Sequence, residues 1–463
     1  MFRNIFSTFA NCFKIPELKS RILFTMALLA VARLLAYITI PGLDGTALAQ
    51  YLNENAHGFG GLLGTYNRFA GGAYGNCAVG ALGIMPYISA TIILQLMTAV
   101  VPRLSKLVRE EGGRAKIIQY GRYLTVLLCI GQGAYFALGW ENPQKSIGGN
   151  FQGQLVLIDN HAWYLIQTVL IMTTGTMLLM WLGEQITERG IGNGVSLIIT
   201  IGILQALPMA ARGFKDMYFP AGGTATHHLQ GDFILLIALL LIVVAGVIAV
   251  TQAQRKVPVQ YASRMVGQKM YQGTTNYMPL KVNYSGVMPV IFAQSILMLP
   301  QWVFPMIATQ AKAPVLRDVF GKLTLWFGNG SLVYVSVYGL MILFFSYFWV
   351  ATQFNEIQIA DDLKKNGGYI PGVRPGQQTS DYLHKAMTRI TLAGALFLTV
   401  IAVIPILLAK QLNIDQNVAS FFGGTSILIT VGVLLDTMRQ VESHLMMRHY
   451  DGFLKKGRLR GRF

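Results

Sequence analysis

The chain has 463 residues, of which 53% are hydrophobic and only 12% are charged. Soluble globular domains carry about 25% charged residues, so this composition excludes a water-soluble protein and indicates that lipid is its second solvent. The 37 Lys and Arg residues exceed the 20 Asp and Glu residues. Such an excess is typical either of nucleic-acid binding or of the aqueous loops of a membrane protein, and the positions of the charges decide between the two.

Ten stretches of the chain are long and apolar enough to cross a bilayer. A spanning helix needs about 20 mostly apolar residues, because no backbone polar group can stay unpaired in hydrocarbon. The predicted spans are 22–40, 76–101, 117–139, 162–182, 191–208, 233–254, 286–308, 332–353, 390–409 and 416–435. Two of them contain a charge, Arg33 in the first and Arg122 in the third. The sequence therefore predicts an all-α polytopic membrane protein with ten transmembrane helices.

The basic residues gather on one side of this predicted topology. The N-terminal segment, the loops after the even-numbered spans and the C-terminal segment together hold 27 of the 37 Lys and Arg residues. Because positive residues favour the cytoplasmic side, both termini are predicted to be cytoplasmic. The topology explains the charge, so nucleic-acid binding loses its motivation, apart from ribosomal RNA as a docking surface.

Ten spans divide into two halves of five. An odd number of spans in each half gives the halves opposite orientations, as in inverted-repeat transport folds. The predicted organisation is a cytoplasmic N-terminal segment, a first half, an outer-face connector, a second half and a basic cytoplasmic tail, at 1–21, 22–208, 209–232, 233–435 and 436–463. The second half contains two long basic cytoplasmic loops, 255–285 and 354–389, which we call the docking loops.

The outer-face loop 41–75 is rich in glycine and weakly apolar, as in Gly58–Gly64 and Phe69–Gly75. It is too short and too rich in small residues to span. Two interpretations stay open: a disordered loop, or a short re-entrant helix surrounded by protein or a water-filled cavity.

Six motifs along the chain resemble the SecY family. They are Pro41–Asp44, Gly83–Thr91, Gly183–Gly194, Pro279–Asn283, Ile370–Gly376 and Phe422–Ser426. The resemblance implies the central channel of a bacterial Sec translocon, a multi-pass inner-membrane protein that conducts unfolded polypeptides and releases apolar helices sideways into lipid. It implies no enzymatic activity, no cofactor and no metal. The implied partners are SecE and SecG, the SecA ATPase, a translating ribosome, the lipid bilayer, and secretory and membrane-protein precursors.

The resemblance also implies a ring of branched aliphatic side chains in the pore. Such an apolar constriction closes a pore by dewetting. The matching positions are Ile84, Ile88, Val195, Ile199, Ile291 and Ile429. The first two and the next two form i, i+4 pairs, so each pair lies on one helix face. Val195 stands where isoleucine is more usual, which predicts a slightly looser ring.

The glycine-rich residues 60–75 match the family's plug, and we call them the plug segment. Small residues let such a segment pack closely and leave at little packing cost. The candidate plug residues are Leu62, Leu63, Gly64, Arg68, Phe69, Gly71, Gly72 and Tyr74. Arg68 indicates that part of the segment faces a water-filled funnel.

The lateral gate is expected between the second and third spans on one side and the seventh and eighth on the other. Gln95, Gln294 and Ser295 are polar groups in these apolar helices, and hydrogen bonds between helices of this kind average only about 0.6 kcal/mol. The alternative is that these side chains bond to their own backbone or face other neighbours.

The docking loops are expected to bind the motor or the ribosome. Arg374 lies within a Pro- and Gly-bounded tip, and the first docking loop supplies Arg255, Lys256, Arg264 and Lys269. The family often has two adjacent basic residues where this chain has Gln268–Lys269. A solvated positive loop explains the charge but not the rigid frame from Pro371 to Gly376.

Two other classes of membrane protein fit less well. A secondary transporter of small solutes needs ionisable residues facing a site at the membrane midplane, and no carboxylate lies at mid-depth in the predicted spans. A membrane-embedded hydrolase needs a paired carboxylate, a Ser/His pair or a zinc motif, which the predicted spans also lack.

Overall fold

The computed structural model describes two compact units. The described residues are 15–54, 64, 66–110, 112–143, 154–218, 230–261, 264–266, 269–271, 275–310, 313–328, 331–411 and 425–456. The N-terminal unit comprises 1–224, 415–421 and 433–463, and the C-terminal unit comprises 225–414 and 422–432. The chain passes from one unit to the other inside the predicted connector 209–232, and its last helix contributes to both units.

A helix coincides with each predicted span. These helices are α2 (Pro16–Leu34), α5 (Met85–Val100), α7 (Gly113–Glu141), α9 (His161–Arg189), α10 (Gly194–Leu204), α12 (Gln230–Gln252), α13 (Met288–Gln310), α15 (Leu332–Gln353), α17 (Gln377–Gln411) and α19 (Thr425–Lys456). Within the described part of the chain, six helices are long and apolar enough to cross a membrane, or seven if the pair formed by α5 and α6 (Pro102–Arg109), bent by 104°, counts as one span. The chain is therefore a multi-pass, mainly helical membrane protein.

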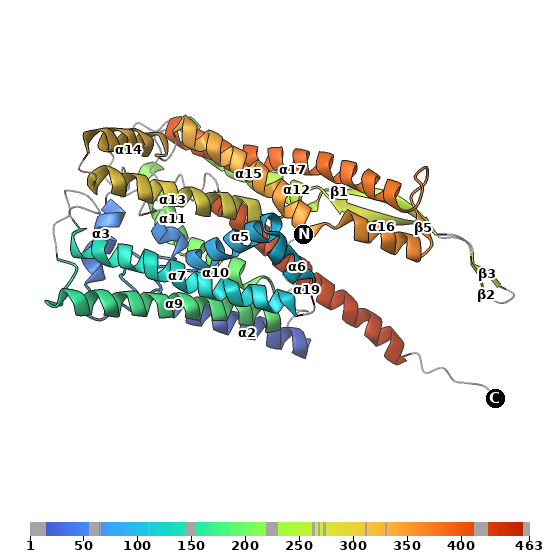
Figure 1. The fold of residues 1–463 in the computed structure, drawn as a ribbon, viewed down its shortest axis with the longest axis horizontal. Coiled ribbons are helices and arrows are strands. Elements are labelled where there is room, and N and C mark those ends of the chain that lie inside the picture. The colour runs from blue at the N-terminus through green and yellow to red at the C-terminus, as the bar shows by residue number, and fades with distance from the viewer. Residues whose placement is uncertain are drawn as a thin grey trace. The chain divides into compact units, whose positions relative to one another are not determined.

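The N-terminal unit packs α2, α5, α7, α9 and α10 against one another. The helices α7 and α9 lie side by side along most of their length, with α5 against α7 and α2 against α9 (Figure 1). The unit also contains the short helices α3 (Gly45–Glu54) and α11 (Leu207–Tyr218). A methyl group placed on Gly175 of α9 would lie 2.1 Å from the carbonyl oxygen of Val79, so this glycine lets α9 pack directly on the backbone of residues 66–84.

Residues 66–84, which we call the turn segment, correct the predicted start of the second span. The prediction placed that span at 76–101, but the helix begins at Met85, and 70–84 are a chain of turns. Gly71, Gly72 and Gly83 have φ between +58° and +81°, a region that glycine reaches without strain but a helix does not use. The segment is apolar because it is buried in protein, which hydropathy does not distinguish from burial in lipid.

The C-terminal unit combines a helical layer with a small sheet. The helices α12 and α15 pack on α17, and α13 packs on α15 and on α14 (Pro314–Trp326). The strands β1 (Gln254–Tyr261), β4 (Thr275–Lys281) and β5 (Gly368–Tyr369) form a sheet in the order β4-β1-β5, antiparallel throughout. A separate hairpin consists of β2 (Arg264–Val266) and β3 (Lys269–Tyr271).

This sheet was missed by the all-α prediction, which treated both docking loops as irregular. The strands β1 and β4 come from the first docking loop, and β5 comes from the second, which also contains α16 (Glu356–Lys365). One buried apolar cluster joins the sheet to the ends of α15 and α17, and it includes Val257, Leu280, Phe354, Ile370 and Leu383. Burial of these side chains holds the two docking loops together as one folded element.

Two helices extend well beyond the predicted spans. Helix α17 begins at Gln377 instead of 390, and α19 continues to Lys456 instead of ending at 435. The added turns are polar, so hydropathy assigned them to a loop and to a tail, yet no proline lies in either added part, and the first glycine after 435 in α19 is Gly452.

Candidate channel site

The described part of the plug segment is folded and buried, so the disordered-loop interpretation is wrong for 66–75. Tyr66 is 3% exposed, and its hydroxyl donates a hydrogen bond of 2.9 Å to the carbonyl oxygen of Leu82. Residues 66–69 make one helical turn before the chain of turns begins. Leu62 and Leu63 lie outside the described residues.

An aromatic cluster fixes the turn segment to α7. The Tyr74 ring lies 4.8 Å from the Phe136 ring and 5.5 Å from the Trp140 ring, and Tyr66 meets Tyr74 edge-on at 5.7 Å, as measured between centroids. Edge-to-face and offset aromatic pairs each add about 0.5–1.5 kcal/mol beyond the area they bury. The expectation that small residues make this segment cheap to displace therefore does not extend to Tyr66 and Tyr74.

The middle of the plug segment is held mainly through its backbone. The Arg68 Nε donates to the Gly64 carbonyl oxygen at 3.2 Å, and the backbone N–H of Gly75 donates to Asn67 Oδ1 at 2.7 Å. Arg68 is half-buried, whereas Phe69 is buried. Gly71 and Gly72 adopt left-handed conformations in succession, with φ of +66° and +81°.

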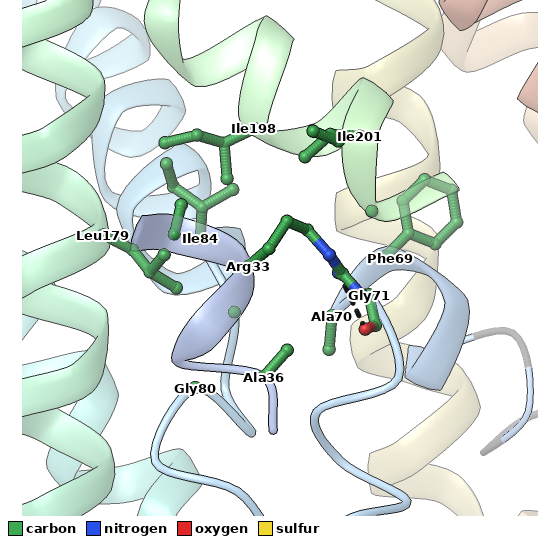
Figure 2. Close-up of a pocket in the computed structure, with 13 residues that line it drawn as sticks. Arg33, Ala36, Phe69, Ala70, Gly71, Gly80, Ile84, Leu179, Ile198 and Ile201 are labelled. Atoms are coloured by element: carbon green, nitrogen blue, oxygen red, sulfur yellow. Dashed lines mark hydrogen bonds between the residues drawn. The ribbon is translucent and has the colours of Figure 1, made fainter. Parts of the chain in front are cut away.

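A small cavity lies between the plug segment, the end of the turn segment and the helices α2, α9 and α10. Its lining is almost entirely apolar and includes Ile84, Ile198 and Ile201. Figure 2 shows Arg33 reaching from α2 across this cavity to Gly71, where its Nη1 donates to the carbonyl oxygen at 3.0 Å. The guanidinium carbon also lies 5.5 Å from the centroid of the Tyr37 ring.

Four of the six predicted ring residues belong to the N-terminal unit. Ile84 precedes the first turn of α5 and Ile88 lies within it, joined by a backbone hydrogen bond of 3.2 Å from the Ile88 N–H to the Ile84 carbonyl oxygen. Val195 and Ile199 lie on α10. Ile199 is buried, but Val195 is half-buried, and its Cγ2 would be 3.3 Å from a methyl group placed on Gly183 of α9.

The other two ring residues belong to the C-terminal unit. Ile291 lies on α13 at 3% exposure, and Ile429 lies on α19 at 0% exposure. All six predicted ring residues are thus branched, and all but Val195 are buried. Ile198 and Ile201 line the cavity in the N-terminal unit. The sequence did not predict them because neither stands at a matching motif position.

The predicted gate residues show two kinds of hydrogen bonding. The Ser295 Oγ donates to the carbonyl oxygen of Ile291 in its own helix at 2.8 Å, which is the self-bonding alternative. The side-chain oxygens of Gln95 on α5 and Gln294 on α13 are buried and accept no hydrogen bond from any described residue. A buried amide oxygen without a donor is costly. Among the three predicted gate residues, Gln95 and Gln294 are therefore the two whose side-chain oxygens can still accept a hydrogen bond.

The docking loops present basic side chains on a folded base. Arg255 and Lys256 are exposed at the start of β1. Arg374 is exposed, and it follows the buried Ile370 by four residues. Arg264 and Lys269 lie on the β2–β3 hairpin.

The Arg374 tip is fixed by hydrogen bonds, as the Pro-Gly frame predicts. Thr379 Oγ1 donates to the Arg374 carbonyl oxygen at 2.9 Å, and the Val373 N–H donates to Ile370 at 3.0 Å. Gly372 and Gly376 take φ of +81° and +102°. The backbone on both sides of Arg374 is therefore held, while its side chain is left in solvent.

The second charge predicted within a span has an acidic partner. Arg122 on α7 pairs with Glu184 on α9, with Nη2 2.6 Å from Oε2 and Nε 3.4 Å from Oε1. This two-point contact joins the two helices that pack along their length. It explains how an arginine is accommodated near the end of a predicted span.

The carboxyl of Asp44, which lies outside the predicted spans, has a lowered pKa. The side-chain and backbone hydrogen bonds that Asp44 accepts from Thr46, at 2.7 and 3.0 Å, lower the pKa of the Asp44 carboxyl. Asp44 directly precedes α3, so its carboxylate satisfies one of the free N–H groups at the start of that helix.

Comparison with known proteins gives one consistent answer. The SecY family matches residues 78–438. The chain is 44% identical to the protein translocase subunit SecY of Streptomyces galbus over 454 residues, which covers 97% of this chain and all of that protein. It is 40% identical to the subunit of the same name from Thermotoga maritima over 463 residues, covering 99% of this chain and all of that protein.

Solved structures agree at the level of the fold. A structure described as a protein conducting channel superposes with a TM-score of 0.62 at 16% identity, covering 95% of this chain and 94% of that chain. Sec61 in the canine ribosome-channel complex from the endoplasmic reticulum superposes with a TM-score of 0.58 at 16% identity over the same shares.

The helical architecture and the buried plug segment define a polytopic channel protein of the translocase type. The chain belongs to the SecY family. This membership confirms the ten-helix, two-half fold and the role of channel subunit of the Sec translocon, and it removes the alternative of a small-solute transporter.

Proposed function

We propose that this chain conducts unfolded polypeptides across the bacterial inner membrane and releases apolar segments sideways into lipid. The observation that carries the proposal is the plug segment. Its residues 66–75 are folded and hydrogen-bonded inside the N-terminal unit, against a cavity whose lining includes branched aliphatic side chains. A channel for polypeptide must be tight when idle and wide in use, and an apolar constriction with a removable segment meets both needs.

The six predicted ring residues form the constriction of the proposed channel. All six are branched and all but Val195 are buried, which suits a seal that excludes water, since apolar walls offer a sliding chain no hydrogen bonds. Gln95 and Gln294 mark the two sides of the proposed lateral gate. Their buried oxygens accept no hydrogen bond from a described residue. They can therefore accept new hydrogen bonds when the gate helices move.

The proposed orientation places both termini and both docking loops in the cytoplasm, because these segments hold most of the basic residues. The docking loops then bind the SecA ATPase or a translating ribosome, through Arg374 and through Arg255, Lys256, Arg264 and Lys269. SecE and SecG complete the membrane complex, and the substrates are secretory and membrane-protein precursors.

We further propose that the chain itself catalyses no reaction and uses no cofactor. The relatives are named as translocase subunits. In this scheme the free energy for movement comes from the motor, and the channel contributes only a path and a seal.

The direct test reconstitutes the purified complex in vesicles with SecA, ATP and an unfolded precursor. The expected result is precursor that becomes protected from added protease, in an amount that depends on ATP. A second measurement deletes residues 62–74 and records ion conductance of the idle complex in planar bilayers, which should rise. Absence of protected precursor with fully inserted, SecE-bound protein would refute the proposed function.

A further inference from the structure

Arg33 is a cation in the last turn of α2, within the first predicted span. Its neighbours along the chain from Ala27 to Leu35 are all apolar, and a charge at such a position is expensive unless it is paired. Within the described part of the chain no carboxylate forms an ion pair with it. Its partners are the carbonyl oxygen of Gly71 at 3.0 Å and the face of the Tyr37 ring. The positive charge is therefore stabilised by neutral groups, one of which belongs to the plug segment.

The backbone of the plug segment is shaped to accept this contact. A methyl group on Gly71 would lie 2.4 Å from Arg33 Nη1, and one on Gly72 would lie 2.5 Å from Gln205 Nε2. Both glycines also have positive φ, so any other residue would be strained there, and its Cβ would displace the end of the Arg33 or Gln205 side chain. Two consecutive glycines thus bring the chain into contact with two polar side chains.

Helix α10 closes the same contact from the other side. Gly202 lies so close to the plug segment that a methyl group there would be 3.3 Å from the Phe69 carbonyl oxygen and 3.4 Å from Gly71 Cα. Gln205, one turn further on, has a buried Oε1 that accepts no hydrogen bond from a described residue. Arg33 is the one polar side chain among the described residues that line the cavity, and Figure 2 shows it directed at Gly71. Gln205 lies beside Gly72.

We infer that Arg33, assisted by Gln205, is a polar latch that holds the plug segment in its seated position, and this inference rests on the proposed function. The apolar lining can accept the segment at several heights with similar burial, because dispersion contacts are not directional. The charge-assisted hydrogen bond to the Gly71 carbonyl has one geometry, so it selects one seated position. When the segment leaves, water replaces that carbonyl on the guanidinium, which keeps the latch reversible.

The test compares idle ion conductance per inserted complex with ATP-dependent precursor translocation in the same preparations. Arg33→Met keeps the aliphatic stem and removes every donor. It should raise idle conductance on the order of 10- to 100-fold, which corresponds to loss of one hydrogen bond to a charged group, while translocation is retained. Arg33→Lys keeps a charged donor without the planar fork and should leak less than Arg33→Met.

A second variant reaches the same contact with Arg33 intact. Gly202→Val places a branched side chain against Phe69 and Gly71 and should also raise idle conductance, so the inference stays testable if Arg33→Met fails to insert. The matched control is Arg122→Met, which removes the other cation within a predicted span together with its pair to Glu184. It should leave idle conductance at the wild-type level.

The outcomes separate the latch from the proposed function. The latch alone is overturned if the wild-type complex translocates and Arg33→Met has wild-type idle conductance. If Arg33→Met fails to insert, Gly202→Val takes its place in this comparison. Equal leakage in Arg122→Met and Arg33→Met also overturns it, because the effect would then be general destabilisation. Wild-type complex that does not translocate at all refutes the proposed function, whatever the conductances.

Discussion

Tyr66→Phe isolates one buried hydrogen bond of the turn segment. The substitution removes one oxygen atom and leaves the ring in its aromatic cluster, so it opens no sizeable cavity. The lost contact is the 2.9 Å hydrogen bond from the Tyr66 hydroxyl to the Leu82 carbonyl oxygen, which joins the two ends of the turn segment. Both groups are buried, at 3% and 0% exposure, so the carbonyl loses a donor that water cannot replace while the segment is seated.

The magnitude follows from the cost of leaving a buried acceptor unpaired, about 1–3 kcal/mol. Every 1.4 kcal/mol changes an equilibrium constant about tenfold. The population of molecules with an unseated turn segment should therefore rise about 5- to 150-fold in Tyr66→Phe.

The native thiol of Cys77 reports this population, because it lies in the turn segment at 0% exposure. With Cys12 and Cys129 replaced by Ser, alkylation of Cys77 requires opening, and its rate follows the open population when opening and closing are fast. The matched control is Tyr164→Phe, which removes an equally buried hydroxyl that donates to Ala137 at 3.0 Å and joins α9 to α7. Cys77 alkylation at the wild-type rate in Tyr66→Phe, or equal acceleration in both variants, would refute the reasoning.

Three further predictions follow from the proposed topology and site. Single cysteines in 255–285 or 354–389, in a cysteine-free background, should resist impermeant thiol reagents in intact cells, and labelling from outside would reverse the orientation. Ile88→Ser and Ile429→Ser should each raise idle conductance in planar bilayers because they wet the constriction, and an unchanged value in both would remove these residues from the pore. Arg374→Glu should insert and bind SecE but lower SecA-dependent import into vesicles roughly tenfold or more, since it reverses the charge on a fixed tip. Import at the wild-type level would show that Arg374 contributes only to the general positive charge of this surface.

The sequence was informative where one physical signal dominates. Apolar length located the ten helices, and the glycine and proline run at Pro371–Gly376 predicted a fixed tip, because positive φ and a locked proline ring leave few backbone conformations. The motif register also pointed to the plug segment.

It was uninformative where burial in protein and burial in lipid look alike. The turn segment reads as part of a span because residues from Asn76 to Ile84 are mostly apolar, yet they fold into turns against α9. The β4-β1-β5 sheet was invisible for a related reason. Its strands β1 and β4 bury few of their residues, and β5 has only two residues, so pairing between distant segments decides whether the sheet forms.

The sequence by itself determined that this is a ten-helix membrane protein with an uneven distribution of positive charge, because hydropathy and charge are local properties that sum along the chain. Tertiary structure alone decided what Arg33 does. Its carbonyl partner at Gly71 lies 38 residues away, and no periodicity relates two positions so far apart. Only folding brings α2, α10 and the plug segment to one point, where the left-handed backbone of two glycines leaves room for an arginine and a glutamine.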